Sequence, residues 1–307
     1  MSGGRGSDVL RRLAGSRGHQ SKTRAEAADE RQGRERTAPR PRETEVTGWK
    51  GFRQRHGLAV VGVLNFLVFF VVWQLVQTYT PVVDTQWVPT PTAILKDLYE
   101  NLADGVLLEQ ARYSFTNMLI AYLLSVLVGV PLGLVMGVSR TFRMLLGPYM
   151  WALYAAPTIA IAPVVILILG IGAPATILVI AMNAFFPLAI NTMDGVATVE
   201  ENLVKAARVF GASRYQVLRR VVVPYTLPWI LTGLRIAVTR ALLGMVFVEV
   251  FFSPQGLGYL IRQASDVSDA ATAYSVILIV VISSVLLVQL FRYLEAKFTP
   301  WSQEIQI

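Results

Sequence analysis

Long apolar segments alternate with shorter polar ones from residue 58 onward. The apolar segments are Leu58 to Thr78, Phe115 to Val138, Leu146 to Leu169, Ala175 to Met193, Trp229 to Phe252 and Ala273 to Phe291. A helix needs about 20 consecutive, mostly apolar residues to cross the hydrocarbon core of a bilayer. The pattern therefore predicts an all-α polytopic membrane protein with six transmembrane helices.

The basic residues of the connecting loops predict how these spans are oriented. The loops after the second, fourth and sixth spans carry Arg140, Arg143, Lys205, Arg208, Arg214, Arg219, Arg220, Arg292 and Lys297. The alternate loops hold Lys96, Arg112 and Arg262. Because basic loops are retained on the cytoplasmic side, we expect both termini and the 194–228 loop in the cytoplasm.

Composition excludes several kinds of chemistry. The 307-residue chain is 54% hydrophobic and has no cysteine, and its two histidines, His19 and His56, precede the first span. Disulfides, thiolate metal sites and histidine-based sites among the spans are therefore excluded. The net charge of +8 gathers in the N-terminal tail and beside apolar segments, which is typical of membrane orientation. We expect contact with the lipid bilayer, no enzyme activity, and no catalytic residue, metal, cofactor or nucleic-acid partner.

Residues 1–50 differ from the rest of the chain. They are rich in Arg, Gly, Ser, Glu and Pro and show no apolar periodicity. Such a segment buries too little apolar surface to offset the entropy of ordering. We expect a disordered basic cytoplasmic tail over residues 1–50 and a transmembrane domain over residues 51–307.

Glycines and prolines mark places where the spans pack closely or bend. Gly129, Gly133 and Gly137 form a double G-x-x-x-G ladder, which suits close helix packing within the chain or at a subunit interface. Proline removes a backbone donor from a helix. The positions at which we expect kinks are Pro131, Pro157, Pro163 and Pro187.

Two outer loops carry shorter elements. Residues 81–112 combine prolines with spaced leucines, which predicts a short interfacial amphipathic helix. The stretch from Gly256 to Ile261 is too short to span a membrane, and we expect it to dip back into the protein.

Glu249 is the acidic residue deepest in an apolar segment. A charge at that depth costs at least about 2.5 kcal/mol, so Glu249 should face the bundle interior or a wet cavity. Arg235 and Arg240, on the same span, are its nearest basic candidates in sequence. A role in lining a pathway and a purely structural ion pair or hydrogen bond are both open, and Arg240 and Asn183 are further candidates for the pathway or interior.

The 194–228 loop predicts two short helices that meet at a glycine. Capping boxes at Thr198 to Glu201 and at Ser213 to Gln216 would start them. Gly211 suits the left-handed residue that ends the first helix. Pro224 is expected to close the second helix before the fifth span. Small and apolar side chains on this loop suit docking into a groove on a partner.

The spacing of residues in this loop resembles a known signature. Lys205, Ala206 and Ala207 are followed by three residues, Gly211, nine residues and Val221 to Pro224. The cytoplasmic signature of ABC-importer permeases reads EAA, three residues, G, nine residues, I, any residue, L, P. Lys205 therefore stands where the family has Glu. The runs from Leu218 to Pro228 and from Thr232 to Ala237 are also similar to permeases for sulfonate, taurine, nitrate and similar small solutes, and Glu249 and the stretch from Gly256 to Ile261 extend this similarity.

This resemblance implies a type I ABC-importer permease fold with the 194–228 loop as a cytoplasmic coupling helix-turn-helix. It further implies an inner-membrane location, ATP-hydrolysing partner subunits, an extracytoplasmic solute-binding protein and a second permease copy, as a homodimer. The chain has no G-x-x-x-x-G-K-[ST] phosphate loop, so ATP hydrolysis would fall to a separate subunit. The solute is expected to be a small anion. The residues assigned to the ATPase-coupling loop are Glu201, Lys205, Ala206, Ala207, Phe210, Gly211, Ser213 and Pro224.

Other functions remain as alternatives. An ion-gradient-driven secondary carrier would often show paired repeats with broken helices, and no convincing repeat is found. A membrane enzyme would need clustered catalytic side chains. Ala207 to Ser213 also resembles the turn of a DNA-binding helix-turn-helix, but that function requires a third packing helix and a free recognition helix. A loop with no partner and only a structural role is a further alternative.

Overall fold

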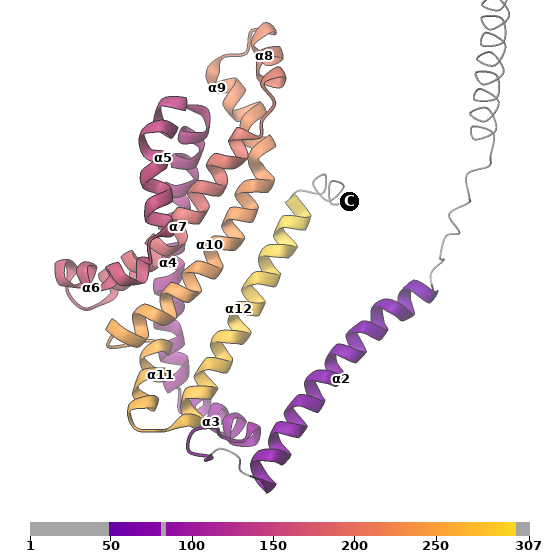
Figure 1. Ribbon diagram of the computed structural model, residues 1–307, viewed down its shortest axis with the longest axis vertical. Helices are drawn as coiled ribbons and strands as arrows, with labels where there is room; N and C mark the ends of the chain where they lie inside the picture. The colour runs from indigo at the N-terminus through magenta and orange to yellow at the C-terminus, as the bar shows by residue number, and fades with distance from the viewer. Residues whose placement is uncertain (1–48, 81–83, 299–307) are drawn as a thin grey trace, which may run out of the picture. The chain divides into compact units, whose positions relative to one another are not determined.

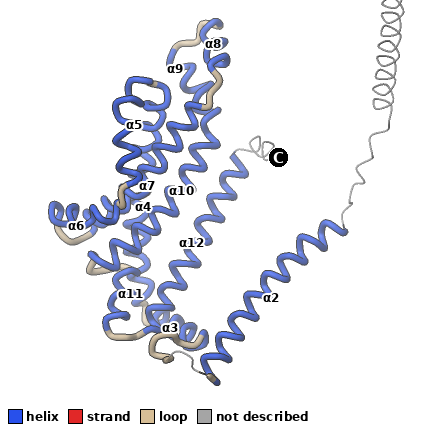
Figure 2. Tube along the Cα trace, viewed as in Figure 1, coloured by secondary structure: helices blue, strands red, loops and turns tan. Residues whose placement is uncertain are grey.

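The computed structural model describes residues 49–80 and 84–298, and these ranges contain no strand (Figures 1 and 2). The tail expected over residues 1–50 lies almost entirely outside the described residues. The chain divides into two compact units, residues 1–67 and 68–307. The described part of the first unit is the beginning of α2 (Trp49–Tyr79), a continuous helix.

The second unit contains the end of α2 and all later helices. These are α3 (Pro91–Ala103), α4 (Val106–Val138), α5 (Arg140–Ala155), α6 (Thr158–Leu169), α7 (Ala173–Ala197), α8 (Glu201–Val209), α9 (Arg214–Val217), a π-helix (Leu218–Val222), α10 (Val223–Phe252), α11 (Leu257–Asp266) and α12 (Ala270–Phe298).

Three described helices, α4, α7 and α12, are long and apolar enough to cross a membrane. Two further groups of consecutive helices, each bent at a short break, would each add one span if the whole group crosses the membrane once. The first is α5 with α6, bent by 104°, and the second runs from α9 through α10 to α11, bent by 43°. The apolar stretch Leu64–Tyr79 of α2 is shorter than these. The described residues thus contain three to five candidate spans, and the count of six stays a prediction.

The third apolar segment is divided between α5 and α6 and is not one straight helix. Pro157 lies at the break, and the residue before it has ψ 141°. Proline lacks an N–H group and pushes the preceding residue toward extended backbone, so the helix ends there. Helices continue through Pro131, Pro163 and Pro187. The kinks expected at these three prolines stay predictions.

The core of the second unit is built around α7. This helix makes its most extensive contacts with α4 and α10, and Figure 1 shows the three side by side. Met118 of α4, Ile180 and Leu188 of α7, and Met245 of α10 all belong to one buried cluster. Because α7 is covered on two sides, much of its circumference is apolar.

The glycine ladder of α4 faces α7. A Cβ added at Gly133 would lie 2.5 Å from the carbonyl oxygen of Ala189 and 2.6 Å from Cβ of Thr192. A Cβ added at Gly137 would collide with Val196. Of the two roles considered for the ladder, the structure shows close packing within the chain.

α3 confirms the short amphipathic helix predicted within residues 81–112. Thr90 caps it, since Oγ1 of Thr90 accepts a hydrogen bond from the N–H of Ala93 at 3.3 Å. The carboxylate of Asp97 accepts hydrogen bonds from the hydroxyls of Thr272, at 2.8 Å, and Ser275. These bonds fasten α3 to the beginning of α12.

Candidate functional site

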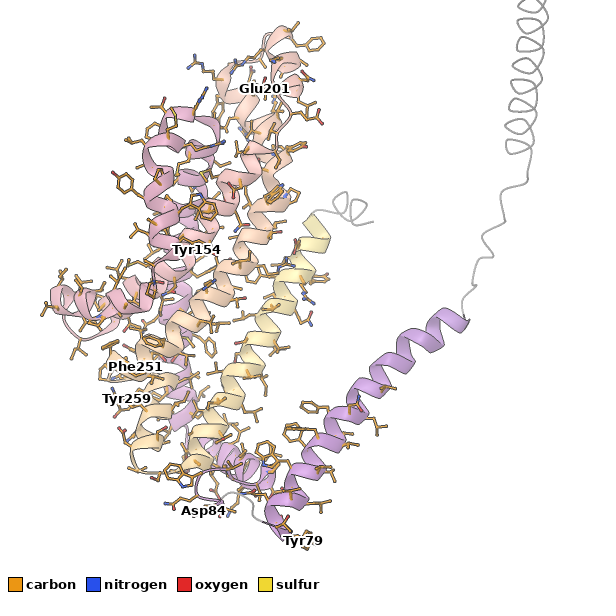
Figure 3. The ribbon with its side chains drawn as sticks, viewed as in Figure 1. Tyr79, Asp84, Tyr154, Glu201, Phe251 and Tyr259 are labelled. Carbon is orange, nitrogen blue, oxygen red and sulfur yellow. The ribbon has the colours of Figure 1, made fainter. Side chains whose placement is uncertain are left out.

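The 194–228 loop forms two short helices at one end of the second unit, where Figure 3 labels Glu201. The turn between α8 and α9 contains Gly211, whose φ is +81°. This is the left-handed backbone that the sequence predicts, and it favours glycine because a side chain there is strained. The chain then passes from α9 through the π-helix directly into α10.

One of the two predicted capping boxes is confirmed. Oγ of Ser213 accepts a hydrogen bond from the N–H of Gln216 at 3.3 Å, and Oε1 of Gln216 accepts one from the N–H of Ser213 at 2.8 Å. The box predicted at Thr198 is wrong. The Thr198 hydroxyl donates to the carbonyl oxygen of Gly195 at 2.8 Å, so it closes the end of α7, and α8 begins after Glu200 without a side-chain cap.

Pro224 does not close the second helix, contrary to the prediction. It lies in the first turn of α10, and Pro228 lies further along the same helix. The preceding turn is a π-helix, in which the N–H of Val223 bonds to the carbonyl oxygen of Leu218, five residues back. A proline lacking an N–H group is tolerated where a helix changes its hydrogen-bond pattern.

The tip of the loop exposes large apolar side chains. Phe210 is 90% exposed and Val209 is 84% exposed, whereas Ala207 is partly buried against the loop's own cluster around Val196, Val217 and Val222. Ala206 is exposed beside them. Exposed aromatic side chains next to a small residue are typical of a contact surface for a partner.

Lys205, which replaces the glutamate of the signature, pairs within α8. Its Nζ donates to Oε2 of Glu201 at 2.9 Å, and both side chains are exposed. Glu four residues before Lys is the favourable order on a helix. The hydrogen bond and charge of Lys205 lower the pKa of Glu201.

Glu249 is fully buried where α4, α10 and α11 meet. Its Oε2 accepts hydrogen bonds from the hydroxyl of Ser114 at 2.7 Å and the N–H of Gly258 at 3.1 Å. Oγ of Ser114 accepts a bond from the N–H of Leu257 at 2.8 Å, and Oε1 of Gln110 accepts one from the N–H of Gly256 at 2.6 Å. Side chains of α4 and α10 thus accept hydrogen bonds from three N–H groups at the start of α11 that have no partner within the helix. We call these residues, Gln110, Ser114, Glu249 and Gly256 to Gly258, the α11 anchor.

Two glycines make room for this carboxylate. A Cβ at Gly256 would run into the carboxyl group of Glu249, and a Cβ at Gly258 would lie 2.6 Å from its Cβ. Gly256 also has φ +111°, a conformation that other residues rarely adopt. The G-x-G spacing is the sequence signal for this site, whereas Ser114 and Gln110 carried no local signal and were missed.

The other polar candidates are not brought to Glu249. Nη1 of Arg235 pairs with Oε2 of Glu295 in α12 at 2.9 Å. The guanidinium of Arg240 lies 5.9 Å from the ring centroid of Tyr154, which Figure 3 labels. Oδ1 of Asn183 accepts a hydrogen bond from the Thr158 hydroxyl at 2.9 Å. Neither arginine is therefore the partner of Glu249. In the described part of the chain no group of three acidic or histidine residues could hold a metal.

The profile of the family described as "binding-protein-dependent transport system inner membrane component" matches residues 129–300, which include the loop and the α11 anchor's glycines. The chain belongs to this family. The chain is similar to a taurine transport permease, TauC, of Escherichia coli (strain K12), which is 31% identical over 84% of this chain and 94% of its own length. A protein assigned to aliphatic sulfonates transport in Bacillus subtilis (strain 168), SsuC, is 32% identical over 81% of this chain and 90% of its length. The nitrate import permease NrtB of Leptolyngbya laminosa is 28% identical over 78% of this chain and 88% of its own length.

The fold of this permease is also similar to a solved transporter. A chain of the inward-facing MetNI methionine ABC transporter superposes with a TM-score of 0.53 and 18% identity, over 69% of this chain and 99% of that one. The protein is thus a multi-pass membrane component of an ABC importer, and its relatives are transport permeases, not enzymes.

Proposed function

We propose that this chain is the permease subunit through which a small anion, of the sulfonate, taurine or nitrate type, crosses the inner membrane. The family match over residues 129–300 carries the proposal. Relatives named for taurine, aliphatic sulfonates and nitrate support the choice of a small anion. Uptake of labelled taurine, an alkanesulfonate and nitrate by cells that hold the whole transporter tests it. Uptake of none of the three would contradict the anion class.

In this proposal ATP is hydrolysed by separate subunits, which dock on the 194–228 loop. The exposed tip of the loop around Phe210 is the contact, and Gly211 gives the turn its shape. Two permease copies and an extracytoplasmic binding protein complete the transporter. Uptake that survives depletion of ATP while the ion gradient is held would contradict coupling to ATP hydrolysis.

Truncating the loop tip should weaken ATPase docking while the permease stays folded. Phe210→Ala removes a side chain that is 90% exposed, so its removal leaves the core unchanged. An aromatic at the centre of a contact often contributes about 1.4 kcal/mol or more, so we expect about tenfold weaker retention of the ATPase. Co-purification through a tag on the permease measures this. Tyr99→Ala, which removes a 73% exposed aromatic on α3, is the matched control. Equal ATPase retention by both variants would exclude Phe210 from the contact.

The proposed topology places the loop tip and α3 on opposite sides of the membrane. Figure 1 shows α8 and α3 at opposite ends of the second unit. Because the chain has no cysteine, Phe210→Cys and Asp104→Cys each introduce a single thiol at an exposed position. An impermeant maleimide added to intact cells should label position 104 at once and position 210 only after permeabilisation. Labelling of both from outside would contradict the assigned orientation.

We further propose that Glu249 acts as a positioning residue that holds α11 in place. Its contacts are hydrogen bonds to Ser114 and Gly258, and neither arginine of α10 pairs with it. In this role the carboxylate shapes the outer end of the bundle without touching the solute.

A further inference from the structure

A basic groove lies beside the 194–228 loop. It shares Glu201 and Lys205 with the residues assigned to ATPase coupling, whereas its four arginines have no role in that assignment. The groove has a volume of about 760 Å³ and lies between the α4–α5 turn, the end of α7, and helices α8 and α9. Five cationic residues line it: Arg140, Arg143, Lys205, Arg208 and Arg214. Among its described lining residues, Glu201 is the one acidic side chain. We call this cavity the basic groove.

The positive charge of the basic groove exceeds the negative charge beside it. Asp194 of α7 interacts electrostatically with Arg143. The carboxylate of Glu201 is already paired with Nζ of Lys205 at 2.9 Å. Within residues 49–80 and 84–298, no carboxylate lies within 4.0 Å of a guanidinium nitrogen of the four lining arginines. A cleft lined by one sign of charge focuses its field and concentrates counter-ions. The basic groove therefore favours an anion.

Arg143 is fixed in the wall of this groove. Its Nη2 donates to the carbonyl oxygen of Gly137 at 2.6 Å and its Nε to that of Met136 at 3.3 Å. These carbonyls belong to the last turn of α4, where no helical donor remains for them. The side chain is thus ordered before any ligand arrives, which reduces the entropy lost on binding.

The floor of the basic groove is apolar. Val196, Val217 and Val222 form a buried cluster there, and Val204 and Leu218 line it as well. The groove also lies at the ends of α4 and α7, two helices that are apolar enough to span a membrane. It therefore combines several arginines with an apolar surface at the level where a bilayer meets the cytoplasm.

We propose that the basic groove binds a phosphate-bearing anion, either the headgroup of an anionic phospholipid or a soluble phosphate. Arginine forks match phosphate oxygens in geometry and charge. Basic pockets at the cytoplasmic ends of spans are suited to anionic headgroups. A bound phosphate would contact the α4–α5 turn and α8 together, and so hold the loop against the bundle. That last consequence rests on the docking role proposed for the loop, whereas binding itself does not.

Lipid binding to the purified full chain tests the proposal without any ATPase. Native mass spectrometry in detergent would compare retention of phosphatidylglycerol with that of phosphatidylcholine, and inorganic phosphate would be added as a competitor. The groove variant is Arg140→Gln with Arg208→Gln. The control is Arg219→Gln with Arg220→Gln, which removes the same charge from exposed residues of the same loop that do not line the groove. All four side chains are exposed, so both variants should fold.

We expect the unmodified chain and the control to prefer phosphatidylglycerol, and the groove variant to bind it about tenfold more weakly, since charge-assisted hydrogen bonds are lost. Competition by inorganic phosphate would identify a soluble phosphate as a ligand of the groove, and no competition would identify the lipid headgroup. The proposal would be overturned if the unmodified chain retained the two lipids equally and phosphate did not compete. It would also be overturned if the two double variants lost equal amounts of bound phosphatidylglycerol. A variant that lost only ATPase docking would leave the proposal of anion binding unchanged.

Discussion

Glu249→Ala is expected to destabilise the permease by about 3 kcal/mol or more and to abolish transport. The substitution removes the acceptor of two buried hydrogen bonds and leaves the Ser114 hydroxyl and the Gly258 N–H without it. Each unsatisfied buried group costs about 1–3 kcal/mol, and the cavity adds to this. The thermal midpoint in detergent and the uptake of labelled solute in cells would measure the two effects.

Glu249→Gln is the matched variant that separates shape from charge. The amide oxygen can accept the same two hydrogen bonds, so a positioning role predicts that the glutamine variant keeps most of the stability that the alanine variant loses. Wild-type stability of Glu249→Ala would show that the α11 anchor holds nothing in place. Equal losses in both variants would show that the negative charge, and not the hydrogen bonding, is what the site needs.

Gly133→Ala should strongly disturb the packing of α4 against α7. The added Cβ would meet the carbonyl oxygen of Ala189 at 2.5 Å and Thr192 at 2.6 Å, so the backbones of α4 and α7 would have to separate. Overpacking of this kind costs about 1–3 kcal/mol, and more when backbone must move. We expect a lower thermal midpoint and a reduced monodisperse peak in size-exclusion chromatography.

Gly129→Ala is the control for this effect. Its added Cβ would lie 3.4 Å from Phe185 and 3.5 Å from Leu188, which is ordinary contact. Alanine also favours a helix over glycine by about 1 kcal/mol, so stability should be unchanged or higher. If both variants were equally stable, the close approach of α4 to α7 would not depend on Gly133.

Local patterns in the sequence predicted local structure well. The capping box at Ser213 and the left-handed turn at Gly211 are confirmed, because each depends on residues no more than a few positions apart. Local patterns failed where neighbouring structure competes. The Thr198 hydroxyl donates to a carbonyl oxygen of α7, and Pro224 follows a π-helix that no residue type in this segment predicts.

Partners distant in sequence could not be predicted. Ser114 and Glu249 are 135 residues apart and Arg235 and Glu295 are 60 apart, and these pairings exist because α4, α10, α11 and α12 pack together. Sequence proximity suggested Arg235 and Arg240 for Glu249, but residues on one helix are neighbours only at spacings of three or four. The depth of Glu249 was evident from sequence, whereas its hydrogen-bond donors required the fold.

The π-helix between α9 and α10 sets the angular position of the loop. An α-helix advances 100° per residue, and a π-turn inserts one residue more than an α-turn holds. Residues 201–217 are therefore turned by about 100° around the axis of α10, relative to where an unbroken α-helix would place them. The direction in which Phe210 points is thus determined by five residues, Leu218–Val222, that make no part of the exposed tip. Loss of a single residue from this segment would rotate the tip away while leaving every side chain on it unchanged.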